Sequence, residues 1–234
     1  MVTSDRDVRT EAGHAEWLER ARSHLRNADP VLARVIADRP DFDPRRWLRE
    51  LPPMDLFGAL LFQVVGQQLS VAATRATIAR LEERFGGRLP SAAEVLDSDP
   101  AQLRDAGLSW RKAGTLRDLA ERLSDGRLDP DVLAAQTDDE LIAALTEVPG
   151  IGPWTAQGAL IIALGREDVV LAGDLALRKA VRTVYDLDHL PAEEEVLGIA
   201  GKWRPYRSLA TAYLFSAAFA EAAPPAGGAG EETS

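Results

Sequence analysis

The sequence predicts an all-α protein, and three observations support this prediction. Apolar residues recur at helical spacing in almost every periodic segment of the 234-residue chain. Signals that start and stop helices, such as a capping box of Thr137 with Glu140, flank several of these segments. No convincing run of alternating β-branched residues occurs, and the best strand candidate, residues 169–171, is short and reads as an extended linker.

Each expected helix rests on a local pattern of apolar spacing or of capping residues. The expected helices, in chain order, cover residues 17–25, 56–65, 71–85, 99–106, 110–123, 137–145, 153–164, 174–185 and 204–219. The second is strongly apolar and expected to be buried, and the third has one apolar face. The fourth ends before Gly107, and the seventh begins with a proline in its first turn and ends at Gly165. The final stretch, residues 223–234, is small, polar and rich in Pro and Gly, so we expect it to be disordered.

Composition excludes several classes of protein. With 46% hydrophobic and 27% charged residues the balance is that of a globular protein, and the absence of Cys excludes disulfides, thiolate zinc sites, iron–sulfur clusters and thiol catalysis. Three scattered His residues make a His-based zinc site an unattractive hypothesis. No apolar stretch is long enough to span a membrane, and the N-terminus lacks a signal-peptide core, so we expect a cytoplasmic protein. The net charge of −10, taken alone, argues against binding to nucleic acid.

A glycine-rich connection between two expected helices is the first candidate binding feature. Gly150 and Gly152, in Val-Pro-Gly-Ile-Gly-Pro-Trp-Thr-Ala, let the backbone turn tightly and approach a partner closely. The helix that follows directs its exposed N–H groups and positive dipole end at whatever approaches the turn, and a phosphate suits that position. The alternative is a simple helix connection without a ligand.

Asp174 is the candidate catalytic carboxylate. It opens an amphipathic helix, where backbone N–H groups and the helix dipole favour its ionised form. A carboxylate held in this way can stabilise positive charge that develops on a bound molecule. The alternative is that Asp174 serves only as a helix cap. Asp168 is a rival carboxylate, and its position before Val169 fits a structural turn better.

Five strings, in order along the chain, carry a resemblance to one family. They are VGQQLSVA (65–72), GLSWRKA (107–113), LTEVPGIGPWTA (145–156), DVVLAGDLALRKAV (168–181) and KWRPYRS (202–208). Over roughly residues 50–218 the chain resembles the helix-hairpin-helix DNA glycosylase superfamily, in the alkylation-repair branch of bacterial 3-methyladenine DNA glycosylase II. It is similar to a compact form of that branch without the N-terminal β-rich domain.

The resemblance implies an architecture and a site. We expect one domain over residues 1–222, a two-lobed helical bundle with a DNA-binding cleft between a lobe of about 54–165 and a lobe of about 1–53 with 170–221. The catalytic residue would be Asp174. The residues that would contact the DNA backbone are Gly150, Gly152, Thr155, Arg111, Lys112 and Arg178. The backbone carbonyls that would hold a monovalent cation, Na⁺ or K⁺, belong to Thr146, Val148 and Ile151.

The family also implies a plug for the gap left by a flipped base and a pocket for that base. The plug would be Gln68 with Leu69 beside it; the alternative is that Gln67 and Gln68 cap a buried helix. The pocket would be lined by Trp154, Phe215 and Tyr213, whose aromatic faces attract a cationic alkylated purine. Buried aromatic residues at helical spacing are also typical of an ordinary core.

The predicted function is that of a monofunctional glycosylase acting on double-stranded DNA with alkylated purines. No Lys occurs between residues 113 and 178, so the Schiff-base nucleophile of strand-nicking relatives is missing. We expect a monomer with no organic cofactor and no membrane partner. Three alternatives stay open: a non-enzymatic DNA-binding protein, a lyase acting on oxidised bases or mismatches, and a glycosylase for ethenoadenine or hypoxanthine.

The acidic charge is reconciled with DNA binding by an expected division of the surface. The strings that would face DNA keep a set of cations, which includes all three lysines of the chain: Arg111, Lys112, Arg178, Lys179, Lys202, Arg204 and Arg207. We therefore expect a basic or neutral cleft on an acidic body, with modest and salt-sensitive affinity for undamaged DNA.

Overall fold

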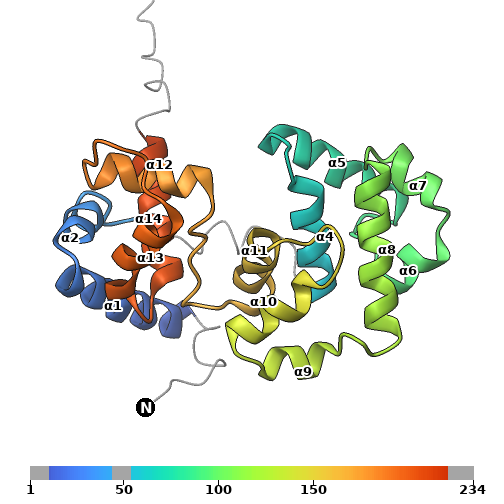
Figure 1. The fold of residues 1–234 in the computed structure, drawn as a ribbon, viewed down its shortest axis with the longest axis horizontal. Coiled ribbons are helices and arrows are strands. Elements are labelled where there is room, and N and C mark those ends of the chain that lie inside the picture. Colours follow the sequence, from blue (N-terminus) through green and yellow to red (C-terminus); the bar gives the residue numbers. More distant parts are fainter. Residues whose placement is uncertain (1–10, 44–53, 221–234) are drawn as a thin grey trace, which may run out of the picture. The chain divides into compact units, whose positions relative to one another are not determined.

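The computed structural model describes residues 11–43 and 54–220, and all regular structure in these ranges is helical, which confirms the all-α prediction (Figure 1). Residues 169–171 form no strand, as expected. The tail 223–234 lies outside the described residues. No helix in the described part of the chain is long and apolar enough to cross a membrane.

The chain divides into two compact units. We call residues 1–44 with 170–234 the terminal unit, and residues 45–169 the middle unit. The lobes expected from the sequence were about 1–53 with 170–221 and about 54–165.

The middle unit is built around a helix without a polar face. α4 (Leu56–Gly66) is buried along most of its length and packs against α11 (Pro153–Leu164). Because a helix that is apolar all round must be covered on all sides, other helices of the unit also pack against α4. The remaining helices are α5 (Val71–Arg84), α6 (Ala92–Asp97), α7 (Pro100–Asp105), α8 (Trp110–Ser124), α9 (Pro130–Ala135) and α10 (Asp138–Thr146).

The terminal unit combines the first described helices of the chain with the last. α1 (Glu11–Ala28) packs against α2 (Pro30–Ala37), and α2 and α12 (Leu175–Val184) both pack against α14 (Arg207–Ala220). α13 (Glu193–Ala200) and a short 3₁₀ turn, η2 (Gly201–Trp203), complete the unit. Its largest fully buried side chains are Trp203 and Tyr213.

The expected helices occur close to their predicted positions, with two kinds of exception. Four further short helices, α2, α6, α9 and α13, were not expected from the sequence. The last helix begins at Arg207 and not at Arg204. Arg204 is extended, with φ −55° and ψ 138°, which is the conformation that the following Pro205 favours.

A buried carboxylate, Asp29, organises the terminal unit. It caps α2 by accepting from the backbone N–H of Val31 at 2.9 Å, and it accepts from Trp203 Nε1 at 2.8 Å and from the Tyr185 hydroxyl. Lys202 Nζ lies 3.1 Å from the same carboxylate, so this lysine, expected on a DNA-facing string, is paired with a buried acid. Burial alone would raise the pKa of Asp29, but these hydrogen bonds hold it below its ordinary value.

We expect Asp29→Asn to lower the free energy of unfolding by about 2 kcal/mol near neutral pH, because the buried donors of Trp203 and Tyr185 lose a charged acceptor. The depressed pKa also sets a pH dependence: the contribution of Asp29 is present above the unfolded-state pKa and is lost as pH falls through the folded-state pKa. Urea unfolding should therefore show a larger loss of stability in the wild type than in the variant between about pH 6 and about pH 3. Asp41→Asn, at an exposed position of the same unit, is the control and should leave both quantities near their wild-type values.

Candidate functional site

The glycine-rich connection forms a tight hairpin between α10 and α11 in the middle unit. Val148 and Ile151 are buried in the core, and the Ile151 N–H donates to the Val148 carbonyl at 3.0 Å. Gly150 has a φ of +94°, a conformation that L side chains rarely adopt. The two apolar anchors thus turn inward while Gly150, between them, is exposed.

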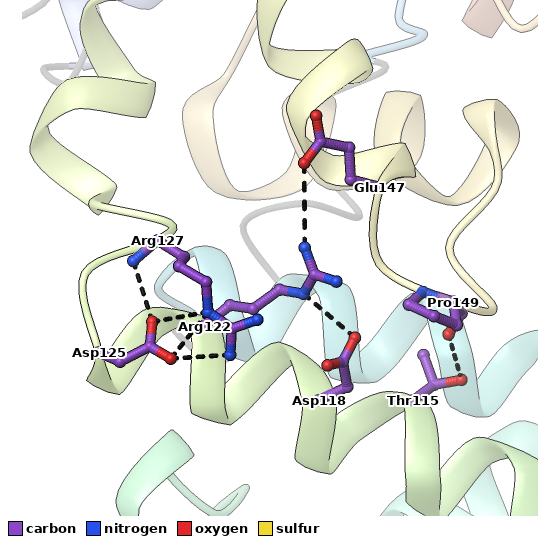
Figure 2. A network of polar contacts seen from close by, with 7 residues as sticks. All are labelled: Thr115, Asp118, Arg122, Asp125, Arg127, Glu147 and Pro149. Atoms are coloured by element: carbon purple, nitrogen blue, oxygen red, sulfur yellow. Dashed lines mark hydrogen bonds and ion pairs between the residues drawn. The ribbon is translucent and has the colours of Figure 1, made fainter.

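The hairpin rests on α8 at two points, as Figure 2 shows. Buried Thr115 donates its hydroxyl to the Pro149 carbonyl at 2.8 Å. Further along α8, Arg122 contacts Asp118 at 3.2 Å and reaches Glu147, just after α10, at 3.9 Å. Because Glu147 is largely exposed, the second contact is weak, and Thr115 makes the closer one.

The first turn of α11 is capped by Gly152, which supplies no side-chain hydrogen bond. Its N–H groups and positive dipole end are therefore suited to an anion, as predicted. Thr155, however, is only 2% exposed, and its Oγ1 accepts from Gln67 Nε2 at 2.9 Å. The Thr155 hydroxyl is therefore occupied by Gln67, and the contact of Thr155 with the DNA backbone stays a prediction. The roles of Gly150 and Gly152 stay predictions.

A turn between α4 and α5 presents the two predicted plug residues. The Leu69 N–H donates to the Gly66 carbonyl at 3.1 Å, and the φ of Gln68 is +57°, which makes residues 66–69 a type II β-turn. Position three of such a turn favours Gly, so Gln68 holds a strained conformation. Gln68 is exposed and Leu69 is 42% exposed, which suits a plug.

Gln67 points the other way and reaches the hairpin. Its Nε2 donates to the Gly150 carbonyl at 3.0 Å as well as to Thr155. Gln67 is also the C-cap residue of α4, where its backbone N–H donates to the Gln63 and Val64 carbonyls, so the capping alternative is confirmed for Gln67. Its part in the site was missed because the sequence shows two adjacent glutamines, and only the turn conformation separates their directions.

The start of α8 lies beside the same turn. Lys112 Nζ donates to the Val65 and Gln67 carbonyls, both at 2.8 Å, so this ammonium closes the end of α4. Burial, helped by the neighbouring charge of Arg111, lowers the pKa of Lys112. Lys112 thus has an internal role that the sequence did not predict. Its DNA-backbone role stays a prediction, as does that of the exposed Arg111. Trp110 has no predicted role, yet it is 63% exposed, and the Arg104 guanidinium carbon lies 5.2 Å from the centre of its ring.

Asp174 is the N-cap of α12 in the terminal unit. Its carboxylate accepts from the Leu177 N–H at 2.9 Å, and the residue is half-buried. The capping prediction is confirmed, and it is compatible with catalysis because one carboxylate oxygen is enough for the cap. A second carboxylate approaches the residue before it: a Cβ added at Gly173 would lie 3.0 Å from Glu193 Oε1.

Arg178 and Tyr213 both make internal contacts in the terminal unit. Arg178 Nε donates to the Pro191 carbonyl at 2.7 Å and so fixes the segment before α13, while its DNA-backbone role stays a prediction. Tyr213 is fully buried, accepts from Arg22 Nε at 2.8 Å and packs edge-on against Phe42, so the prediction that it lines the base pocket is wrong. Burial raises the pKa of the Tyr213 hydroxyl, and the negative charge of Glu19 adds a smaller effect in the same direction.

The other pocket and cation residues stay predictions. Trp154 is 38% exposed on the first turn of α11, and Phe215 is half-buried on α14. For the cation, the Val148 carbonyl already accepts from Ile151, and the Thr146 hydroxyl donates to the Ala143 carbonyl. Among the residues that the structure describes, no group of His and carboxylate side chains could hold a metal ion.

The sequence and fold match known proteins over most of the chain. Residues 62–205 match the HhH-GPD superfamily of base excision DNA repair proteins. The chain is 31% identical over 200 residues to DNA-3-methyladenine glycosylase 1 of Schizosaccharomyces pombe, which covers 85% of this chain and 86% of that protein. The structure of the S. pombe 3-methyladenine DNA glycosylase Mag1 in complex with abasic DNA superposes with a TM-score of 0.76, at 30% identity, over 84% of this chain and 95% of that one.

A bacterial structure is also similar to this chain in fold and sequence. The crystal structure of DNA-3-methyladenine glycosidase from Bacillus halodurans gives a TM-score of 0.65 at 31% identity, over 82% of this chain and 92% of that one. Two Bacillus subtilis relatives are longer, and the chain spans 58% and 59% of their lengths at 28% and 26% identity. The family match contains the Gln68 turn, the hairpin and Asp174. The chain therefore belongs to the HhH-GPD superfamily of base excision DNA repair proteins.

Proposed function

We propose that the protein is a monofunctional DNA glycosylase of base excision repair that removes alkylated purines of the 3-methyladenine and 7-methylguanine type from double-stranded DNA. The observation that carries this proposal is Asp174, a half-buried carboxylate at the N-cap of α12, in a chain whose relatives over most of their length are named 3-methyladenine DNA glycosylases. The product is an abasic site and a free base.

The reaction needs one carboxylate and one water. As the bond between C1′ and the base nitrogen breaks, its electrons leave with the base and the sugar becomes oxocarbenium-like. The carboxylate of Asp174, held by the Leu177 N–H, stabilises that positive charge. Water adds its oxygen to C1′ and releases a proton. Because alkylation at N3 or N7 makes the purine cationic and hence a good leaving group, no strong general acid is required.

The middle unit supplies the DNA contacts. The N–H groups at Gly152 and the first turn of α11 bind a phosphate, and Gln68 with Leu69 fills the gap left by the flipped base. Trp154 of this unit is the candidate for aromatic contact with the cationic purine, and Phe215 is the candidate that the terminal unit offers. The carbonyls of Thr146, Val148 and Ile151 would hold a Na⁺ or K⁺ ion. No organic cofactor takes part in the reaction. The protein acts as a monomer. A chromosomal substrate places it in the bacterial cytoplasm.

The test is to incubate the protein with methylated duplex DNA and to identify the released bases by chromatography. We expect 3-methyladenine and 7-methylguanine in the supernatant and abasic sites that break only after added alkali. Strand nicking without alkali, with a covalent adduct trapped by borohydride, would favour the lyase alternative. DNA binding without release of any base would favour the non-enzymatic alternative. Release of ethenoadenine or hypoxanthine alone would favour the alternative in which the protein is a glycosylase for those bases.

A further inference from the structure

Residue 67 is tied to two distant parts of the middle unit. Its side-chain amide donates to the Gly150 carbonyl and to Thr155 Oγ1, 83 and 88 residues along the chain. Its backbone carbonyl accepts from Lys112 Nζ, 45 residues away. One residue therefore connects the Gln68 turn with the 148–152 hairpin and with the start of α8.

The contacts of Lys112 fix the shape of the turn. Its ammonium binds the Val65 and Gln67 carbonyls, which flank Gly66, the first residue of the β-turn. Relaxation of Gln68 from its positive φ would require the peptide group between residues 67 and 68 to rotate, and that group carries one of the two carbonyls held by Lys112. Lys112 thus opposes the loss of the strained conformation that exposes Gln68.

Among the described residues of the middle unit, three of the four exposed large apolar side chains lie on the linked elements, and the fourth, Val132, lies on α9. Leu69 belongs to the turn, Trp154 follows the hairpin, and Trp110 precedes Lys112 on α8; they are 42%, 38% and 63% exposed. The hydrogen bonds through Gln67 and Lys112 join all three of these segments. The parts that would meet DNA are therefore held as one body by these two side chains.

We propose that Gln67 and Lys112 are positioning residues that hold the base-replacing turn at a fixed distance from the phosphate-binding hairpin. A duplex gripped by its backbone at the hairpin then presents its helical stack to Gln68 without further adjustment of the protein. Ordering these parts in advance removes a cost of binding that would otherwise be met each time a base is flipped. The inference rests on the proposed function for the role of the turn.

The test is a double-mutant cycle on DNA affinity, measured by fluorescence anisotropy with duplexes that contain or lack a tetrahydrofuran abasic analogue. In the wild type, Gln68→Ala should weaken binding to the abasic duplex by about tenfold, which is about 1.4 kcal/mol. In the Gln67→Ala background the same change should cost less than about twofold, because the turn is no longer held in register. Affinity for the undamaged duplex should change little in either background.

Matched variants separate positioning from general stability. Gln67→Glu keeps the shape but puts an acceptor against the Gly150 carbonyl, so it should behave as Gln67→Ala does. Lys112→Met keeps the stem and loses both bonds, whereas Lys112→Arg can still donate to both carbonyls and should restore the effect of Gln68→Ala. Gln102→Ala, at an exposed position on α7, is the control. Urea unfolding establishes that each variant is folded.

An equal cost of Gln68→Ala in the wild type and in the folded Gln67→Ala, Gln67→Glu and Lys112→Met backgrounds would overturn the proposal, as would a failure of Lys112→Arg to restore it. The cycle uses binding alone, so its outcome is separate from catalysis. If the wild type released no base but the cycle still showed coupling, the proposed enzyme activity would fail while the positioning role would stand.

Discussion

Replacement of Asp174 by Asn should abolish release of alkylated bases and leave the protein folded and able to bind DNA. Asn is as good an N-cap as Asp, so the bond to the Leu177 N–H and the start of α12 should survive. What disappears is the negative charge opposite the oxocarbenium-like sugar. Loss of one such preorganised electrostatic contact costs on the order of a hundredfold to a thousandfold in rate.

The measurement is single-turnover release of 3-methyladenine from methylated duplex DNA, with anisotropy on the abasic duplex run in parallel. Asp168→Asn is the matched control, since Asp168 is the other carboxylate of the same string, and it should retain most of the activity. Asp174→Ala should lose the same activity and, in addition, about 1 kcal/mol of stability through the missing cap. Normal rates in Asp174→Asn, or a larger loss in Asp168→Asn, would move the catalytic role away from Asp174.

Local signals predicted much of the fold because they depend on neighbouring residues alone. The Thr137 and Glu140 capping box forms as expected, with the Thr137 N–H 2.9 Å from the Glu140 carboxylate. Gly165 ends α11 in the left-handed conformation, and Asp174 begins α12. In each case the residue type supplies the donor, the acceptor or the backbone freedom that a helix end lacks.

The partners of long polar side chains could not be predicted in this way. Lys112 and Lys202 stood in strings expected to face DNA, yet one ends at two carbonyls of α4 and its turn and the other at buried Asp29. Arg178 likewise ends at the Pro191 carbonyl. A backbone carbonyl without a helical partner, or a buried carboxylate, can bind a cation in place of a phosphate, and sequence does not show which acceptor lies within reach.

These internal contacts change the expectation for DNA affinity. A cation whose donors are bound inside the protein releases fewer counterions when DNA arrives. Two of the seven cations expected on the DNA-facing strings, Lys112 and Lys202, should therefore contribute little to the salt dependence. With a net charge of −10, the protein should depend on fewer phosphate contacts and more on the backbone N–H groups of the hairpin. The conformation of the hairpin then becomes the decisive structural feature of binding.

Gly150→Ala tests this conformation and should lower the free energy of unfolding by about 4 kcal/mol. The φ of Gly150 is +94°, which disfavours any L side chain, and an added Cβ would lie 2.2 Å from Thr115 Oγ1. Thr115 is buried, so it cannot move away without breaking its 2.8 Å bond to the Pro149 carbonyl. DNA binding should fall with stability, because that bond holds the hairpin on α8.

Two further variants distinguish the steric clash from backbone strain. Gly165→Ala also places a side chain at positive φ, but no atom lies within 4 Å of its Cβ, so urea unfolding should show a cost of only about 1 kcal/mol. Thr115→Ala removes the atoms that the new Cβ would strike, and Gly150→Ala should cost markedly less in that background than in the wild type. Additive costs for the two substitutions would mean that backbone strain alone accounts for the effect, and the packing of the hairpin against Thr115 would then not be what holds its conformation.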